Sequence, residues 1–218
     1  MLHRLLLLLI CWPVNAQLLK VAVMDSGVRP ALSVNYCKGE AKSFIDDNIR
    51  DFSGHGTNVS YLINANLDHL PYCQVILKIW KPGIHNGKAY MAALDYLTTR
   101  NDIKIVNLSI SGEGFSYPEK LLIQRLLDQG KILIVAAGND NKNLDEKCDA
   151  YPACYDKRIV VVANGEKGKP LSGSNYGKVV DFYINGVNKG PNVLKLTGSS
   201  QSTAILTNKT IKSILKTN

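Results

Sequence analysis

Short apolar runs recur along the chain, and several are separated by stretches with a helical pattern. The runs are compact and bounded by polar or glycine-containing segments, which predicts buried strands. We expect strands at residues 18–24, 74–79, 103–110, 132–136, 159–163 and 179–184, and helices at residues 57–66, 88–99 and 118–129. Gly130 directly follows the last helix and suits its carboxyl end. This alternation predicts an α/β fold with a mostly parallel sheet and helices on both faces.

The composition is that of one globular domain. The chain has 218 residues, of which 45% are hydrophobic and 20% charged, and a chain of this length buries about 70% of the surface that it exposes when unfolded. We find no repeat with the period of roughly 20 to 50 residues that marks solenoid proteins. The polar segments 140–158 and 165–177 are therefore predicted to be surface loops and not linkers to a second domain.

Residues 1–16 have the pattern of a secretory signal peptide. Residues 1–4 are short and basic, residues 5–12 are apolar, and residues 14–16 offer a small-residue cleavage site. A membrane anchor is the alternative, but the apolar run is much shorter than the roughly 20 residues that span a bilayer. We expect secretion or delivery to a periplasm, no stable membrane anchor after cleavage, and one folded domain at residues 17–218.

Four cysteines remain after the predicted cleavage. An even number of cysteines in an exported chain predicts two disulfides, although the number alone allows three ways of pairing them. None of the spacings is that of a Cys-x-x-Cys zinc or redox site, so free or metal-binding thiols are the weaker interpretation. The four are Cys37, Cys73, Cys148 and Cys154.

Basic residues outnumber acidic residues. The sequence has 26 Lys and Arg against 18 Asp and Glu, which gives a net charge of +8. Such a charge invites a nucleic-acid interpretation, but the basic residues are scattered and no nucleic-acid-binding motif accompanies them. We therefore expect a solvated basic surface and no nucleic-acid partner.

Four polar side chains stand at the ends of predicted strands or the starts of predicted helices. Asp25 ends the first run, and His55 lies between two glycines that enter a helix. Asn139 follows the run 132–136, and Ser200 lies in a serine-rich turn. Taken singly, each has an ordinary explanation as a turn former, a helix cap or a solvated loop residue. In an open parallel sheet, however, chemistry gathers outside the carboxyl ends of the strands.

In the order Asp, His, Asn, Ser, the four segments resemble the subtilisin-like serine proteases. The motifs are Val23-Met24-Asp25-Ser26-Gly27-Val28, Gly54-His55-Gly56-Thr57, Ala136-Ala137-Gly138-Asn139 and Gly198-Ser199-Ser200, the last with Ser199 where the family usually has threonine. Further similar segments are residues 106–112, Tyr151-Pro152-Ala153 and Ser174-Asn175-Tyr176-Gly177. The resemblance covers roughly residues 19–210. It implies a three-layer, doubly wound α/β fold with a mostly parallel sheet.

The resemblance implies a secreted serine endopeptidase that cleaves polypeptides through an acyl-enzyme intermediate. The sequence has no dense carboxylate loop of the kind that forms the calcium sites of some relatives, so we expect no metal. We also expect no cofactor and a monomer. Asp25 is expected to orient His55, which accepts the proton of the nucleophile Ser200. The side-chain amide of Asn139 is expected to stabilise the oxyanion. The substrate-binding residues implied are Ser109, Ile110, Ser111, Gly112, Ala137 and Gly138. Ser111 stands where the family commonly has glycine, which is expected to narrow the main specificity pocket.

Two features depart from the family pattern. Little sequence lies between the predicted cleavage site and the first strand, so we expect no inhibitory propeptide. After Ser200 the family usually has small residues, a proline and a long helix, whereas here we expect a shorter and more polar helix that carries Asn208, Lys209 and Lys212.

Two other functions stay open at this point. A pseudoprotease would bind peptides in the same groove without cutting them, and the altered carboxyl-terminal segment favours this alternative. A parallel α/β domain that uses Asp25 for a metal or a phosphate is more remote, because it leaves the other three polar residues unexplained and no phosphate-binding loop follows a strand. Of the three glycosylation sequons, those at Asn58 and Asn107 fall in segments expected to be buried, which leaves Asn208 as the expected acceptor.

Overall fold

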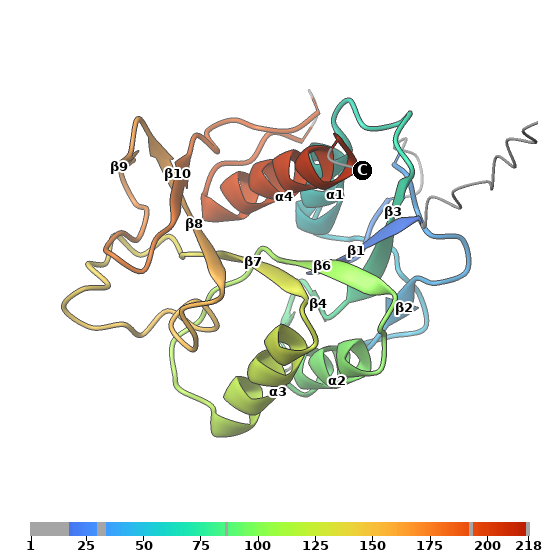
Figure 1. Cartoon of the computed structure of the whole chain (residues 1–218), viewed down its shortest axis with the longest axis horizontal. Helices are drawn as coiled ribbons and strands as arrows, with labels where there is room; N and C mark the ends of the chain where they lie inside the picture. Colours follow the sequence, from blue (N-terminus) through green and yellow to red (C-terminus); the bar gives the residue numbers. More distant parts are fainter. Residues whose placement is uncertain (1–17, 30–33, 86, 192–193, 217–218) are drawn as a thin grey trace, which may run out of the picture.

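The structure is a computed structural model that describes residues 18–29, 34–85, 87–191 and 194–216 (Figure 1). The predicted signal peptide at residues 1–16 lies outside the described residues.

A twisted sheet forms the centre of the molecule (Figure 1). Seven strands pair side by side in the order β10-β8-β7-β6-β1-β3-β2, and all of these pairs are parallel. The predicted mostly parallel sheet is therefore confirmed. The strands are β1 (Leu19–Asp25), β2 (Lys42–Ser43), β3 (Tyr72–Lys78), β6 (Ile103–Leu108), β7 (Ile132–Ala136), β8 (Val160–Glu166) and β10 (Phe182–Ile184).

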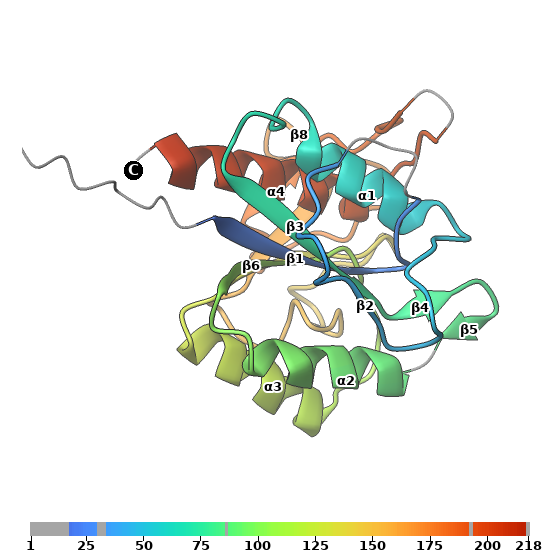
Figure 2. The ribbon, with the colours of Figure 1, turned by 90° about the vertical axis from the view of Figure 1, so that its right-hand side faces the viewer.

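Helices cover both faces of the sheet. Helices α1 (His55–Asn64) and α4 (Ser199–Lys216) lie on one face, and α2 (Gly87–Thr98) and α3 (Tyr117–Asp128) lie on the other (Figure 2). Each face encloses its own hydrophobic core. The fold is thus the three-layer α/β architecture that the resemblance implies. Among the described residues, no helix is long and apolar enough to cross a membrane.

Strand β1 shows why the predicted strands read as continuous apolar runs. Val21 and Val23 belong to the core beneath α1 and α4, whereas Ala22 and Met24 belong to the core beneath α2 and α3. Successive side chains of a strand point to opposite faces. Because both faces are covered, the positions from Val21 to Met24 are all apolar, as is typical of parallel sheets.

The sequence pattern does not predict the strands of two residues, of which β2 is one. Strands β4 (Trp80–Lys81) and β5 (Ile84–His85) form a small hairpin, and β9 (Lys169–Pro170) pairs antiparallel with the end of β8. The segment 165–177 was predicted to be a surface loop, but part of it is strand β9. A strand of two residues carries no periodic pattern, so its pairing partner and not its sequence determines it.

Helix α3 begins and ends one residue before the predicted range 118–129, and its flanking residues explain both ends. Ser116 precedes the helix and accepts a hydrogen bond from the backbone N–H of Glu119, and Pro118 occupies the first turn, where its missing N–H costs nothing. Gly130 follows the helix with a φ of 73°, a left-handed conformation that glycine adopts without strain.

Helix α4 is polar and carries Asn208, Lys209 and Lys212, as expected. It has 18 residues, and its buried polar side chains are paired. Thr207 donates to the side-chain oxygen of Asn107 at 2.8 Å, and Asn208 donates to the backbone carbonyls of Ile63 at 2.8 Å and Ala65 at 2.9 Å. The prediction that Asn208 accepts a glycan is therefore wrong, because its amide is buried and bonded between two helices.

The two disulfides join Cys37 to Cys73 and Cys148 to Cys154. The first ties the segment before β2 to strand β3, and the second closes a short loop between β7 and β8. The structure thereby selects one of the three pairings that the sequence left open.

The chain order of the strands places a switch point beside β1. The chain passes from β1 to β3 on one side and then crosses to β6 on the other. At such a point the connections leave the sheet in opposite directions and open a crevice at the carboxyl ends of the strands. The carboxyl ends of β1 and β6 flank this crevice, where the candidate site lies.

Candidate active site

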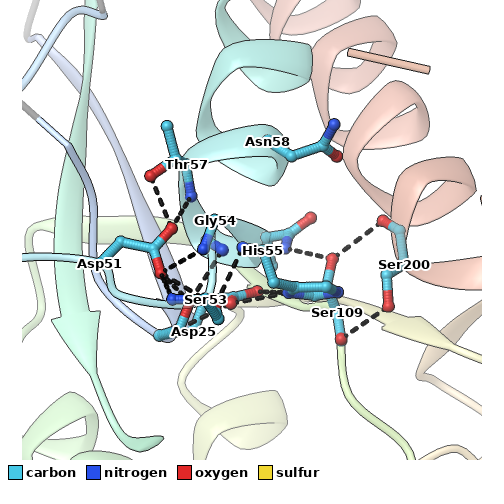
Figure 3. A network of polar contacts seen from close by, with 12 residues as sticks. Asp25, Asp51, Ser53, Gly54, His55, Thr57, Asn58, Ser109 and Ser200 are labelled. Atoms are coloured by element: carbon cyan, nitrogen blue, oxygen red, sulfur yellow. Dashed lines mark hydrogen bonds and ion pairs between the residues drawn. The ribbon is translucent and has the colours of Figure 1, made fainter. Parts of the chain in front are cut away.

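Asp25 and His55 form a buried pair at the end of β1. Asp25 is the last residue of the strand and is only 1% exposed. The Nδ1 atom of His55 lies 2.8 Å from Oδ1 and 3.0 Å from Oδ2 of Asp25 (Figure 3), and the backbone N–H of Ser26 also donates to Oδ1, at 2.7 Å. Since a carboxylate only accepts hydrogen bonds, the proton belongs on Nδ1, which leaves Nε2 of the neutral ring as an acceptor.

Opposing effects act on the pKa of His55. Burial on its own lowers the pKa, but the charge of Asp25, the hydrogen bond to Asp25 and the charge of Asp51 raise it by more. The pKa of His55 therefore lies above its ordinary value of 6.5. The site thus favours the cationic imidazolium, which is the form a general base takes after it has accepted a proton.

Two glycines place His55 at the start of α1. Gly54 precedes the helix with a φ of 86°, a conformation that side chains disfavour. Gly56 packs so closely against the turn after β1 that an added Cβ atom would lie 2.3 Å from the carbonyl oxygen of Gly27. This close approach brings the first turn of α1 against the end of β1, so that the histidine meets the aspartate.

Asp51 holds the same helix start, and sequence analysis missed it. Its Oδ1 accepts hydrogen bonds from Ser26, Ser53 and the backbone N–H of Gly54, and its Oδ2 accepts from the N–H and hydroxyl of Thr57, at 2.6–2.9 Å. Figure 3 shows this hub beside His55. Burial on its own raises the pKa of Asp51, but these hydrogen bonds lower it below its ordinary value. The available signal was an acidic residue four positions before His55.

Ser200 lies in the first turn of α4 and faces the loop after β6. Its hydroxyl donates to the carbonyl oxygen of Ser109 at 2.9 Å, and the hydroxyl of Ser109 donates back to the carbonyl oxygen of Ser200 at 3.0 Å (Figure 3). In this conformation Ser200 makes no hydrogen bond with His55. Asn107 donates to the Ser109 hydroxyl at 3.0 Å, so β6 and α4 are joined by a chain of hydrogen bonds.

Asn139 follows β7 and faces the start of α4. Its side-chain oxygen accepts the backbone N–H of Ser199 at 2.8 Å. Within the part of the chain that the structure describes, no protein group accepts a hydrogen bond from its Nδ2 atom. The bond to Ser199 therefore orients the amide and leaves an N–H donor available beside Ser200.

A cavity of about 480 Å³ unites these side chains. The ring of Trp80 forms one wall and lies 5.8 Å from the ring of His55, between centroids. Of the residues predicted for the site, those that line the cavity are His55, Ser109, Ile110, Ser111, Gly138, Asn139 and Ser200, while Asp25 lies behind His55.

Two residues predicted to bind substrate do not line this cavity. Ala137 is fully buried in the core of the sheet and does not line the cavity. Gly112 lines two neighbouring cavities, but its backbone N–H and C=O are both bonded to Tyr151, at 2.9 and 2.8 Å. The free edge beside the cavity is therefore shorter than predicted and centres on Ile110 and Ser111.

The arrangement has the parts needed for acyl transfer. A carboxylate orients an imidazole, and the imidazole, a hydroxyl and an amide donor line one cavity. No group of three His, Cys, Asp or Glu side chains close enough to hold a metal ion occurs in the described ranges.

Comparison with known proteins identifies the family. Residues 17–213 match the subtilase family, Peptidase S8. The chain belongs to this family. The minor extracellular protease Epr of Bacillus subtilis is 29% identical over 200 residues, which cover 85% of this chain and 30% of that protein. The thermostable alkaline protease of Halalkalibacterium halodurans is 26% identical over 196 residues, which cover 84% of this chain and 53% of that protein. The subtilase chain thus spans about a third to a half of these relatives.

Solved structures support the subtilase fold. A cold-adapted subtilisin-like serine proteinase superimposes with a TM-score of 0.75 at 22% identity, covering 92% of this chain and 76% of that one. A lanthipeptide protease superimposes with a TM-score of 0.77 at 17% identity, covering 91% of this chain and 73% of that one. At these identities the likeness shows the fold alone.

Proposed function

We propose that this subtilase is a serine endopeptidase that hydrolyses peptide bonds through an acyl-enzyme intermediate. The observation that carries the proposal is that His55, hydrogen-bonded to Asp25, lines the same cavity as Ser200 and Asn139. The match to the subtilase family supports the same reaction.

In the first step, His55 acts as the general base. A serine hydroxyl is a weak nucleophile at neutral pH and needs a base to take its proton. The hydroxyl of Ser200 leaves the carbonyl oxygen of Ser109, turns toward Nε2 of His55, and attacks the scissile carbonyl carbon as its proton passes to Nε2. Catalytic hydrogen bonds often form only when substrate binds, so their absence from the free protein is compatible with this role.

Two donors meet the charge that develops on the substrate. The carbonyl oxygen becomes an oxyanion, which the Nδ2 atom of Asn139 and the backbone N–H of Ser200 stabilise. His55 then gives its proton to the leaving amine, and the acyl-enzyme forms. Water, activated by the same imidazole, hydrolyses the ester and frees Ser200.

Substrate binds as an extended strand along Ile110 and Ser111. Backbone pairing of this kind depends little on side-chain identity, so selectivity comes from the cavities on either side. The substrates are therefore polypeptides.

A peptide-binding pseudoprotease is the second candidate, and one observation favours it. The hydroxyl of Ser200 is bonded to the carbonyl oxygen of Ser109 and not to His55. A site that keeps this bond when peptide is present would bind chains in the same groove without cutting them.

We further propose that the chain is exported, with residues 1–16 as its signal peptide and residues 17–218 as the peptidase domain, acting as a monomer. The two disulfides support export because such bonds persist mainly in oxidising compartments.

The decisive test is labelling of the purified, disulfide-bonded protein with a fluorophosphonate, which traps activated serines. The endopeptidase predicts labelling that disappears in Ser200→Ala and in His55→Ala. Ser172→Ala is the matched control, because this serine is exposed and lies outside the cavity, and it should label like the unaltered protein. A folded protein that does not label at all supports the pseudoprotease.

A further inference from the structure

A second cavity, of about 220 Å³, adjoins the first. Ser111 and Asp140 line both cavities, so the second one opens directly from the proposed catalytic cleft. Gly112 and Ala150 contribute small groups to its lining. The cavity is thus a side pocket of the cleft and not a separate site.

The position of the second cavity indicates which substrate residue it would receive. The cavity lies between the free edge at Ser111 and the residue that directly follows Asn139. Asn139 is the proposed donor to the oxygen of the scissile carbonyl. In the proposed reaction, the residue that supplies this carbonyl, which is the residue before the scissile bond, would place its side chain at the second cavity.

The charge of the lining is negative. Three carboxylates and one ammonium group line the cavity, which gives a formal charge of −2. Lys142 pairs with Glu113 at 2.5 Å and with Asp149 at 3.4 Å. Asp140, the third acidic residue, has no cationic partner among the described residues. This carboxylate is exposed at the junction of the two cavities, where a substrate side chain would meet it.

A buried amide fixes the position of Asp140. The side-chain oxygen of Asn175 accepts the backbone N–H groups of Asp140 and Lys142, each at 3.0 Å, and its Nδ2 lies 3.4 Å from Oδ2 of Asp140. Asn175 is itself fully buried. The carboxylate therefore stands on an ordered support, which lowers the entropy lost when it binds a cation.

The rest of the lining does not favour an apolar side chain. No aromatic or large aliphatic residue lines the second cavity among the described residues. The charge of this pocket is also opposite to that of the whole chain, which has a net charge of +8. A cationic substrate side chain would be attracted to that pocket, whereas an anionic one would be repelled.

We propose that the second cavity is the main specificity pocket and that Asp140 selects substrates with lysine or arginine before the scissile bond. A cationic side chain reaches past Ser111 and pairs with the unpaired carboxylate of Asp140. This inference rests on the proposed endopeptidase function and specifies its substrate class.

The test compares peptides that differ only in the residue before the scissile bond, with lysine, arginine, phenylalanine, leucine or glutamate at that position. We expect kcat/KM for lysine and arginine to exceed kcat/KM for phenylalanine by about 10-fold or more, the effect of one hydrogen bond to a charged group. In Asp140→Asn, the ratio of kcat/KM for lysine to that for phenylalanine should fall by a similar factor. Because both substrates are cleaved by the same sample, this ratio does not depend on how much protein is folded.

Asp47→Asn is the charge-matched control. It removes one negative charge from an exposed position outside the cavities and should leave the ratio unchanged. Preferred cleavage after phenylalanine or leucine overturns the inference but leaves the endopeptidase function intact. An unchanged ratio in Asp140→Asn also overturns it. If no peptide is cleaved and Ser200 is not labelled, both the inference and the proposed function are wrong.

Discussion

At the scale of single residues, charge around His55 controls the proposed reaction. The imidazole contacts one carboxylate, Asp25, and lies in the field of a second, Asp51. Asp51 does not touch the cavity and acts through the start of α1, which it holds by several hydrogen bonds. It is a positioning residue whose charge also favours the imidazolium.

The pH profile tests this electrostatic arrangement. A general base works only when deprotonated, so kcat/KM should fall as pH drops through the pKa of His55. Because that pKa is raised, the midpoint of the acid limb should lie above pH 6.5. Asp51→Asn removes a nearby negative charge, lowers the pKa and should move the limb to lower pH.

The limb position is independent of the amount of folded protein, so it separates an electrostatic role from a loss of stability. Asp47→Asn, remote from the cavity, should leave the limb in place. If the midpoint of the acid limb is unchanged or moves to higher pH in Asp51→Asn, the charge of Asp51 does not raise the pKa of His55.

The Asn139 donor makes a second prediction at this scale. Its side chain lines the cavity while its oxygen is held by the backbone N–H of Ser199. Asn139→Ala should lower kcat by about 100- to 1000-fold with a small change in KM, because an oxyanion donor acts mainly in the transition state. Steady-state kinetics on one peptide measure both constants. A large rise in KM with unchanged kcat would assign Asn139 to substrate binding instead.

At the scale of elements, α4 matters most because Ser200 lies in its first turn. The helix carries polar residues on its buried face. Some of these side chains form hydrogen bonds to other elements and so fix the position of α4 in the fold. Thr207 bonds to β6 through Asn107, and Asn208 bonds to the end of α1. A polar helix can thus hold the nucleophile in place because its polar groups have partners.

Asn208 offers a direct test of this packing. Asn208→Ala removes two hydrogen bonds and leaves the carbonyls of Ile63 and Ala65 unpaired, so it should lower the free energy of unfolding by about 1–3 kcal/mol. Lys209→Ala, at the exposed neighbouring position, should change it by less than about 0.5 kcal/mol. Urea denaturation measures both. Equal effects would show that the buried amide contributes nothing specific.

At the scale of the whole molecule, the two disulfides close chain loops of different length. The Cys37–Cys73 bond spans 36 residues and the Cys148–Cys154 bond spans 6. A longer loop loses more entropy in the unfolded chain when it is closed, so the chain-entropy relation gives about 4 kcal/mol for the first bond and about 2 kcal/mol for the second.

Paired Cys→Ser substitutions test this order. Removing Cys37 and Cys73 together should lower the midpoint of urea denaturation more than removing Cys148 and Cys154 together. The reverse order would indicate that the short loop carries strain or contacts that the entropy relation does not contain. The second pair also closes the loop that contains Asp149 and Ala150, so its loss should weaken selectivity for lysine as well as stability.

Much of the fold and part of the site could be predicted from the sequence. The main strands and three of the helices were recognisable because each carries its own periodic pattern, and strand β7 was predicted with the bounds it has. The segments of Asp25, His55, Asn139 and Ser200 were recognisable because their motifs are local and follow a family order. Secondary structure and motif identity depend on neighbours in the chain, which the sequence states directly.

Other features depend on contacts between distant segments, and only the tertiary structure decided them. The Cys37–Cys73 bond, the contact between Asp51 and Ser26, and the partners of Asn208 each join residues that lie far apart in the chain. The backbone groups of Gly112 cannot pair with a substrate strand because Tyr151 already occupies them. The unpaired carboxylate of Asp140 appears only when Lys142 is seen to be shared by Glu113 and Asp149. Local sequence determines which groups exist, whereas folding determines which of them are already satisfied and which remain free to act.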